Sequence, residues 1–146
     1  MEKRRIVKEV YPTIFTLLED EKDTVLIEVP DLGITTEGFG MADAVEMARD
    51  AIGLRGIFCE DEGIELAKPT SIDKINPTNG VFAKEGTSYV TLVDIDFVEY
   101  RRRTDTKSVR RNVTIPSWLN HEAEKAHINV SRVLQDALMM KLGVQK

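Results

Sequence analysis

Hydrophobic and polar residues alternate along the first forty positions in the way that is typical of short β-strands. Apolar, β-branched and aromatic residues are concentrated at 10–18, 24–29 and 34–37, and a charged turn at 19–23 separates the first two segments. Alternation returns over 88–100. The pattern therefore predicts four strands, the first two of which form a hairpin.

Three other segments follow the helical period. The first covers about 41–59 after Gly40 as N-cap, and Gly53 and Gly56 weaken its second half and leave its end undefined. The other two are Ser117–Ala126 and an apolar stripe that follows the N-cap Asn129. Residues 60–86 are polar and predict a long loop. Together these segments predict an α+β fold, with an antiparallel sheet and a helix in the N-terminal part.

A fifth strand is predicted at 107–115 and is stopped by Pro116. Its alternation separates an apolar face from a polar one: Val109, Val113 and Ile115 against Arg110, Asn112 and Thr114. Arginine and asparagine make bidentate contacts with guanine and adenine in the DNA major groove, into which a two-stranded β-ribbon fits. We therefore predict that the three polar side chains read DNA bases.

The overall charge of −5 conceals an asymmetry along the chain. Residues 1–100 hold 10 Lys+Arg and 21 Asp+Glu, a net of −11, whereas residues 101–146 hold 10 and 4, a net of +6. Residues 101–106 have no apolar side chain and predict a linker. The sequence thus predicts two domains, 1–100 and 107–146, with different partners, and only the second would be attracted to nucleic acid.

Composition also indicates where in the cell the protein works. The chain has one cysteine, Cys59, and no apolar run near the roughly 20 residues of a membrane span. Its charged N-terminus lacks the apolar core of a signal peptide. We expect a cytoplasmic protein with no membrane partner.

The segment from 107 onward is too small to fold alone. A single strand leaves backbone N–H and C=O groups unpaired, and two short helices bury little surface. Pairing with a second copy in an antiparallel ribbon would present Arg110, Asn112 and Thr114 twice on one face. Apolar residues would then face a shared core with Leu119, Val133, Leu134 and Leu138. We predict a homodimer and leave a higher oligomer open.

These residues resemble the ribbon-helix-helix family of DNA-binding proteins. The resemblance lies in Thr114-Ile115-Pro116, the helix Ser117–Ala126 and the turn Ile128-Asn129-Val130-Ser131. It implies that the start of the second helix, at Asn129, Val130 and Ser131, grips a DNA phosphate, as free N–H groups at helix N-termini do. Lys107, at the start of the strand, is a further candidate phosphate contact.

The N-terminal half resembles the antitoxin HicB. The matching residues are Tyr-Pro-Thr-Ile-Phe at 11–15 and Val-Pro-Asp-Leu at 29–32, followed by a glycine-bounded turn and an alanine-rich helix. Gly40 stands where that family usually has a threonine cap. The resemblance implies a partial RNase H-like domain in an antitoxin of a type II toxin-antitoxin system. Such an antitoxin neutralises a HicA-like mRNA-cleaving toxin and represses its own operon by binding operator DNA.

Two other functions stay open. One is a ribbon-helix-helix regulator whose N-terminal domain senses a ligand. The other is a metal-dependent nuclease, because Asp94 and Asp96 share one strand face and could hold Mg²⁺. The strand at 11–18 supplies no partner carboxylate, so we expect no catalytic residue, no metal site and no cofactor.

Overall fold

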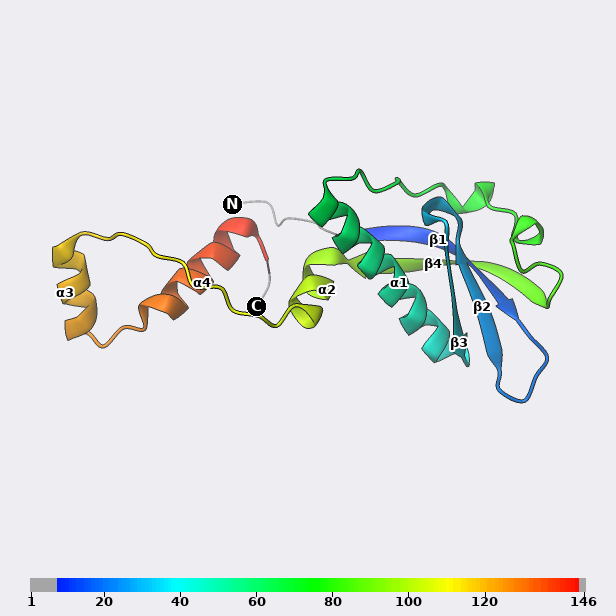
Figure 1. Ribbon diagram of the computed structural model, residues 1–146, viewed down its shortest axis with the longest axis horizontal. Coiled ribbons are helices and arrows are strands. Elements are labelled where there is room, and N and C mark those ends of the chain that lie inside the picture. The colour runs from blue at the N-terminus through cyan, green and yellow to red at the C-terminus, as the bar shows by residue number, and fades with distance from the viewer. Residues whose placement is uncertain (1–7, 145–146) are drawn as a thin grey trace. The chain divides into compact units, whose positions relative to one another are not determined.

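The computed structural model describes residues 8–144, and the chain divides into two units, one ending at Asp105 and the other beginning at Thr106. The first unit contains a four-stranded antiparallel sheet in the order β3-β2-β1-β4 (Figure 1). The strands are β1 (Lys8–Leu17), β2 (Thr24–Val29), β3 (Ile34–Phe39) and β4 (Thr87–Asp96). The predicted α+β class, the four strands and the β1–β2 hairpin are confirmed.

Helix α1 (Met41–Glu62) packs on one face of this sheet. Small residues on the helix allow close approach, and the core that results consists chiefly of Ala44, Ala48 and Ile52 against Tyr11, Phe15, Ile27, Val29 and Val93, all buried. Small side chains on the helix and large ones on the sheet therefore fill this interface together.

The predicted long loop crosses the unit after α1 and contains two short 3-10 turns, η2 (Ile72–Lys74) and η3 (Pro77–Asn79). Hydrogen bonds join this loop to strands β1 and β2. The Tyr11 hydroxyl donates to the Ala67 carbonyl at 2.7 Å, and the Val81 N–H donates to Glu28 Oε1 at 3.1 Å. The loop is thus anchored although it has no strand of its own.

The β3–α1 junction depends on two glycines. A Cβ at Gly38 would lie 2.7 Å from the backbone N and Cα of Ala44, so strand and helix touch there. Gly40, the N-cap of α1, has a φ of 87°, which side-chain-bearing residues rarely adopt. This backbone conformation accounts for glycine where the resembled family usually has threonine.

The strand predicted to reach Tyr100 ends at Asp96, and helix α2 (Phe97–Thr104) begins there. The Asp96 side chain accepts a hydrogen bond from the Glu99 N–H at 3.0 Å and caps the helix. Tyr100 is buried, and its hydroxyl donates to Asp50 Oδ1 on α1 at 2.7 Å. Most of the segment expected to be a linker, 101–104, is therefore the second half of a packed helix.

Helix α1 continues through Gly53 and Gly56, which were expected to weaken it, and runs to Glu62, where Gly63 ends it in a left-handed conformation with a φ of 68°. A Cβ at Gly53 would lie 2.6 Å from the Tyr100 ring, and one at Gly56 would lie 2.1 Å from the Phe97 ring. The two glycines make room for the aromatic rings of α2. Packing against α2 offsets their low helix propensity.

The second unit contains helices α3 (Ser117–Lys125) and α4 (Val130–Leu142), close to the predicted ranges. The strand predicted at 107–115 is absent, because residues 105–116 have no regular secondary structure in the single chain. A strand requires hydrogen bonds to a neighbour, and one copy offers none to this segment. No residue between Thr106 and Val144 is buried in the single chain, so the core predicted to form between two copies stays a prediction.

Among residues 8–144, none of the helices is both long enough and apolar enough to cross a membrane.

The close contact at the β3–α1 junction predicts that Gly38→Ala lowers the free energy of unfolding by about 1–3 kcal/mol, because backbone must shift to admit a methyl group. Urea unfolding followed by circular dichroism measures the change. The matched control is Thr35→Ala, an exposed position on the same strand, with an expected effect below about 0.5 kcal/mol. Equal effects of the two substitutions would contradict this packing.

Candidate DNA-binding surface and the Asp94 cluster

The three predicted base readers lie on the extended segment between α2 and α3. Arg110, Asn112 and Thr114 are all exposed, as are the apolar residues that alternate with them, with Val109 at 89% and Val113 at 52% exposure. Neither face of this segment is covered in the single chain. Polar and apolar residues alternate along this segment, but in the single chain it does not belong to a sheet, so the two kinds of side chain are not separated onto two faces.

The predicted phosphate grip lies at the start of α4. Asn129 is the N-cap, as predicted, and its side-chain oxygen accepts a hydrogen bond from the Arg132 N–H at 3.1 Å. The first backbone bond of the helix runs from the Val133 N–H to the Asn129 carbonyl. The N–H groups of Val130 and Ser131 precede that bond, which is the arrangement that binds anions at helix starts.

The net positive charge of the second unit is smaller than the +6 counted above for residues 101–146. Arg101, Arg102 and Arg103 belong to α2 in the first unit, where Arg101 contacts Glu60 and Asp61 at 3.2 and 2.8 Å. Residues 106–146 keep seven Lys+Arg against three Asp+Glu, a net of +4. The second unit is still basic, and Lys107 is exposed within it.

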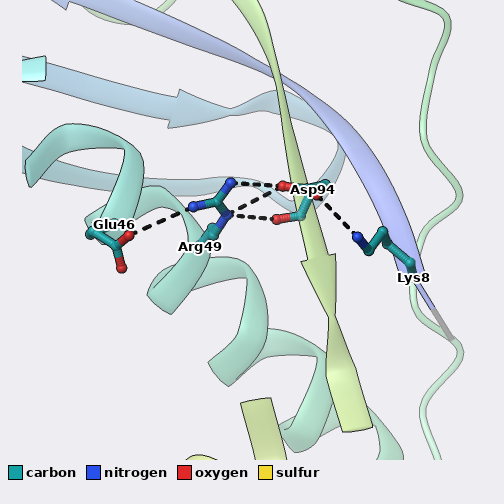
Figure 2. Close-up of polar contacts among 4 residues, drawn as sticks. All are labelled: Lys8, Glu46, Arg49 and Asp94. Carbon is teal, nitrogen blue, oxygen red and sulfur yellow. Dashed lines mark hydrogen bonds and ion pairs between the residues drawn. The ribbon is translucent and has the colours of Figure 1, made fainter. Parts of the chain in front are cut away.

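Asp94, a candidate metal ligand, is held by two cations instead. Figure 2 shows Arg49 of α1 and Lys8 of β1 approaching it from different elements. Arg49 Nη2 lies 2.8 Å from Asp94 Oδ1, and Lys8 Nζ lies 3.4 Å from Oδ2. Arg49 Nε also donates to the Asp94 carbonyl at 3.1 Å, and Glu46 Oε1 lies 3.6 Å from Arg49 Nη1. We call these four residues the Asp94 cluster.

The cluster has an electrostatic consequence. The hydrogen bond from Arg49, and after it the one from Lys8, holds the pKa of Asp94 below its ordinary value. Asp96 is separately engaged as the N-cap of α2. Within residues 8–144, no three His, Cys, Asp or Glu side chains are grouped so that they could hold a metal ion. Asp94 and Asp96 therefore each hold neighbouring elements together, Asp94 through Arg49 and Lys8 and Asp96 as the N-cap of α2.

Comparison with known proteins gives the family. Residues 11–137 match the family described as HicB_like antitoxin of bacterial toxin-antitoxin system. The match begins within β1 and ends within α4, so it includes parts of both units. The chain belongs to the HicB_like antitoxin family. No curated protein sequence matches it.

Two solved structures resemble this antitoxin. One is a toxin-antitoxin complex from Streptococcus pneumoniae, with 22% identity, a TM-score of 0.57, and coverage of 92% of this chain and 99% of the other. The second is the Burkholderia pseudomallei antitoxin HicB, with 21% identity, a TM-score of 0.48, and coverage of 91% and 98%. At this identity, the likeness to the first supports the fold alone.

Sequence reasoning missed the partners of Asp94 in the antitoxin. Lys8 could have been found, because the β1–β4 register pairs Val10 with Asp94 and places Lys8 two residues away on the same face. Arg49 left no comparable signal, since its approach depends on how α1 lies beside the edge strand β4. Only the three-dimensional structure brings these residues together.

The Asp94 cluster predicts a pH-dependent stability difference. Because its pKa is lowered on folding, Asp94 stabilises the fold above its ordinary pKa of 3.8, and this contribution is lost as pH falls through the lowered value. The ion pairs are substantially exposed, so Asp94→Asn should lower the free energy of unfolding by only about 0.5–1 kcal/mol at about pH 7.

Urea titrations at about pH 7 and about pH 2 measure this difference, which should vanish at the lower pH. The control is Asp96→Asn, which keeps a side-chain acceptor at the α2 N-cap and should behave like the wild type at both pH values. An Asp94→Asn defect of the same size at both pH values would contradict the ionic origin.

Proposed function

We propose that this antitoxin neutralises a HicA-like mRNA-cleaving toxin through its first unit and represses its own operon through its second. In this proposal, two copies of the segment 107–115 pair as an antiparallel ribbon that enters the DNA major groove. The resemblance to HicB and to ribbon-helix-helix proteins led to this expectation. The DNA-binding part of the proposal rests on residues 106–144.

The strongest support is that the second unit is incomplete by itself. Its large apolar side chains are exposed, at 54% for Val133, 51% for Leu138 and 68% for Trp118, and no residue of 106–144 is buried. Stable folds this small require a further source of burial, and a second copy supplies burial and strand pairing together. The basic charge and the exposed Arg110, Asn112 and Thr114 then fit a DNA-reading ribbon.

Support for the toxin-binding role comes from charge. The first unit is acidic, and a protein that binds RNA carries a basic surface. Opposite charges speed encounter between such partners and select against wrong ones. The complex from Streptococcus pneumoniae holds, by its title, a toxin together with its antitoxin. The same kind of partner is proposed for this chain.

DNA reading predicts that Arg110→Ala weakens binding to the operator by about 1–3 kcal/mol and relaxes sequence preference, because a bidentate base contact is lost. Asn112→Ala should act in the same direction. Titrations of the full-length protein on operator and random duplexes, each at two salt concentrations, measure affinity and preference together.

Lys107→Ala is the matched control on the same segment. As a phosphate contact it should weaken binding to both duplexes alike and reduce the salt dependence, without changing preference. If Arg110→Ala and Asn112→Ala both keep the operator preference intact, the ribbon is not the base reader.

A further inference from the structure

Helix α1 has a second apolar face, only part of which packs against the core. Its sheet-facing side carries Ala44, Ala48 and Ile52, all buried. Met47, Ala51, Leu54 and Phe58 recur at spacings of four, three and four residues, which places them along one other side of the helix. We call these four residues the α1 stripe.

The stripe is exposed where its side chains are largest. Leu54 is 57% exposed and Phe58 is 55% exposed, whereas Met47 is partly buried against the core. Helix α2 does not cover Leu54 and Phe58, because its Tyr100 and Phe97 side chains contact α1 at Gly53 and Gly56. Single exposed apolar residues are ordinary, but a leucine and a phenylalanine one turn apart form a continuous patch.

Carboxylates border the stripe along one side. Asp43, Asp50 and Asp61 stand at i, i+7 and i+18, about two and five helical turns from the first, and all three are exposed. Hydrogen bonds orient all three, since Asp43 accepts from the Phe39 N–H, Asp50 from the Tyr100 hydroxyl and Asp61 from Arg101. The helix as a whole has six carboxylates and two guanidinium groups.

We propose that the α1 stripe, with its acidic border, is the surface on which the basic toxin docks, an assignment that rests on the proposed function. Leu54 and Phe58 would be the apolar anchors, and the aspartates would face cationic side chains at the rim. Charge selects this occupant. A second copy would bring an identical acidic border against the first across a two-fold axis, and nucleic acid would be repelled.

The test uses the full-length antitoxin and, as the probe, a catalytically inactive HicA-like toxin. Calorimetry should give a dissociation constant that rises with salt. Leu54→Ala and Phe58→Ala should each weaken binding by about tenfold or more, and the double substitution to lysine by about a hundredfold or more. Lysine keeps high helix propensity at both exposed positions, and circular dichroism checks the fold. The alanine variants serve if the lysine variant does not fold.

Leu92→Lys is the matched control. Leu92 is 51% exposed, and it lies on the sheet face away from α1, because its neighbour Val93 points into the core and its β1 partner is Pro12. This variant should bind the toxin as the wild type does. Loss of affinity in Leu92→Lys equal to that in the stripe variants would overturn the assignment.

The outcomes separate the docking surface from the proposed function. Wild-type binding together with unchanged binding by the stripe variants overturns the surface and leaves the toxin role standing. Failure of the wild type to bind overturns the toxin role and the occupant with it. A fall in oligomeric mass or in operator affinity, with toxin binding unchanged, assigns the stripe to a second copy or to the second unit and also overturns the proposal.

Discussion

The pairing of backbone hydrogen-bonding groups is the constraint on which the second unit of this protein depends. Residues 105–116 adopt no regular structure in one chain, although their side chains alternate as a strand requires. Side-chain alternation creates two faces only after neighbouring backbones fix the pleat. Dimerisation, the shared apolar core and the display of Arg110, Asn112 and Thr114 therefore form one coupled event in the proposed mechanism.

The first unit solves the same problem within a single chain. Four strands pair with one another, and α1 covers one face with buried small residues. Helix α2 then docks through aromatic rings at Gly53 and Gly56 and ends one residue before the boundary between the units. Because α2 is both packed on α1 and joined to the second unit, it connects the proposed toxin-binding surface with the proposed DNA-binding ribbon.

The sequence predicted the elements whose pattern is local. Period-two alternation located the four strands of the first unit, and Asn129 marked the start of α4 through its capping chemistry. Failures occurred where a distant contact overrides local preference. Alternation through Phe97 resembled a longer strand, but Asp96 caps a helix there and Tyr100 is buried. Gly53 and Gly56 left the end of α1 undefined in the sequence, although they accommodate rings from a later segment.

The residues of the candidate sites also fall into those that a local pattern predicts and those that only tertiary contacts bring together. Arg110, Asn112 and Thr114 follow from period and chemistry on one short segment, and their display by a second chain stays a prediction. Arg49 and Lys8 at Asp94, and the exposure of Leu54 and Phe58, depend on how helices and strands lie together. No periodicity within one segment reports such contacts, because the residues are dozens of positions apart or differ only in what covers them.

Amide hydrogen exchange of the full-length antitoxin, without DNA or toxin, tests the central claim most directly. The account predicts that several backbone amides within 109–115 exchange at least about a hundredfold more slowly than in an unstructured peptide, because a ribbon between two copies protects them. Protection should decrease on dilution as dimers dissociate. Exchange of this segment at the unstructured rate, at concentrations where the protein is dimeric by mass, would contradict the ribbon and the DNA-binding surface built on it.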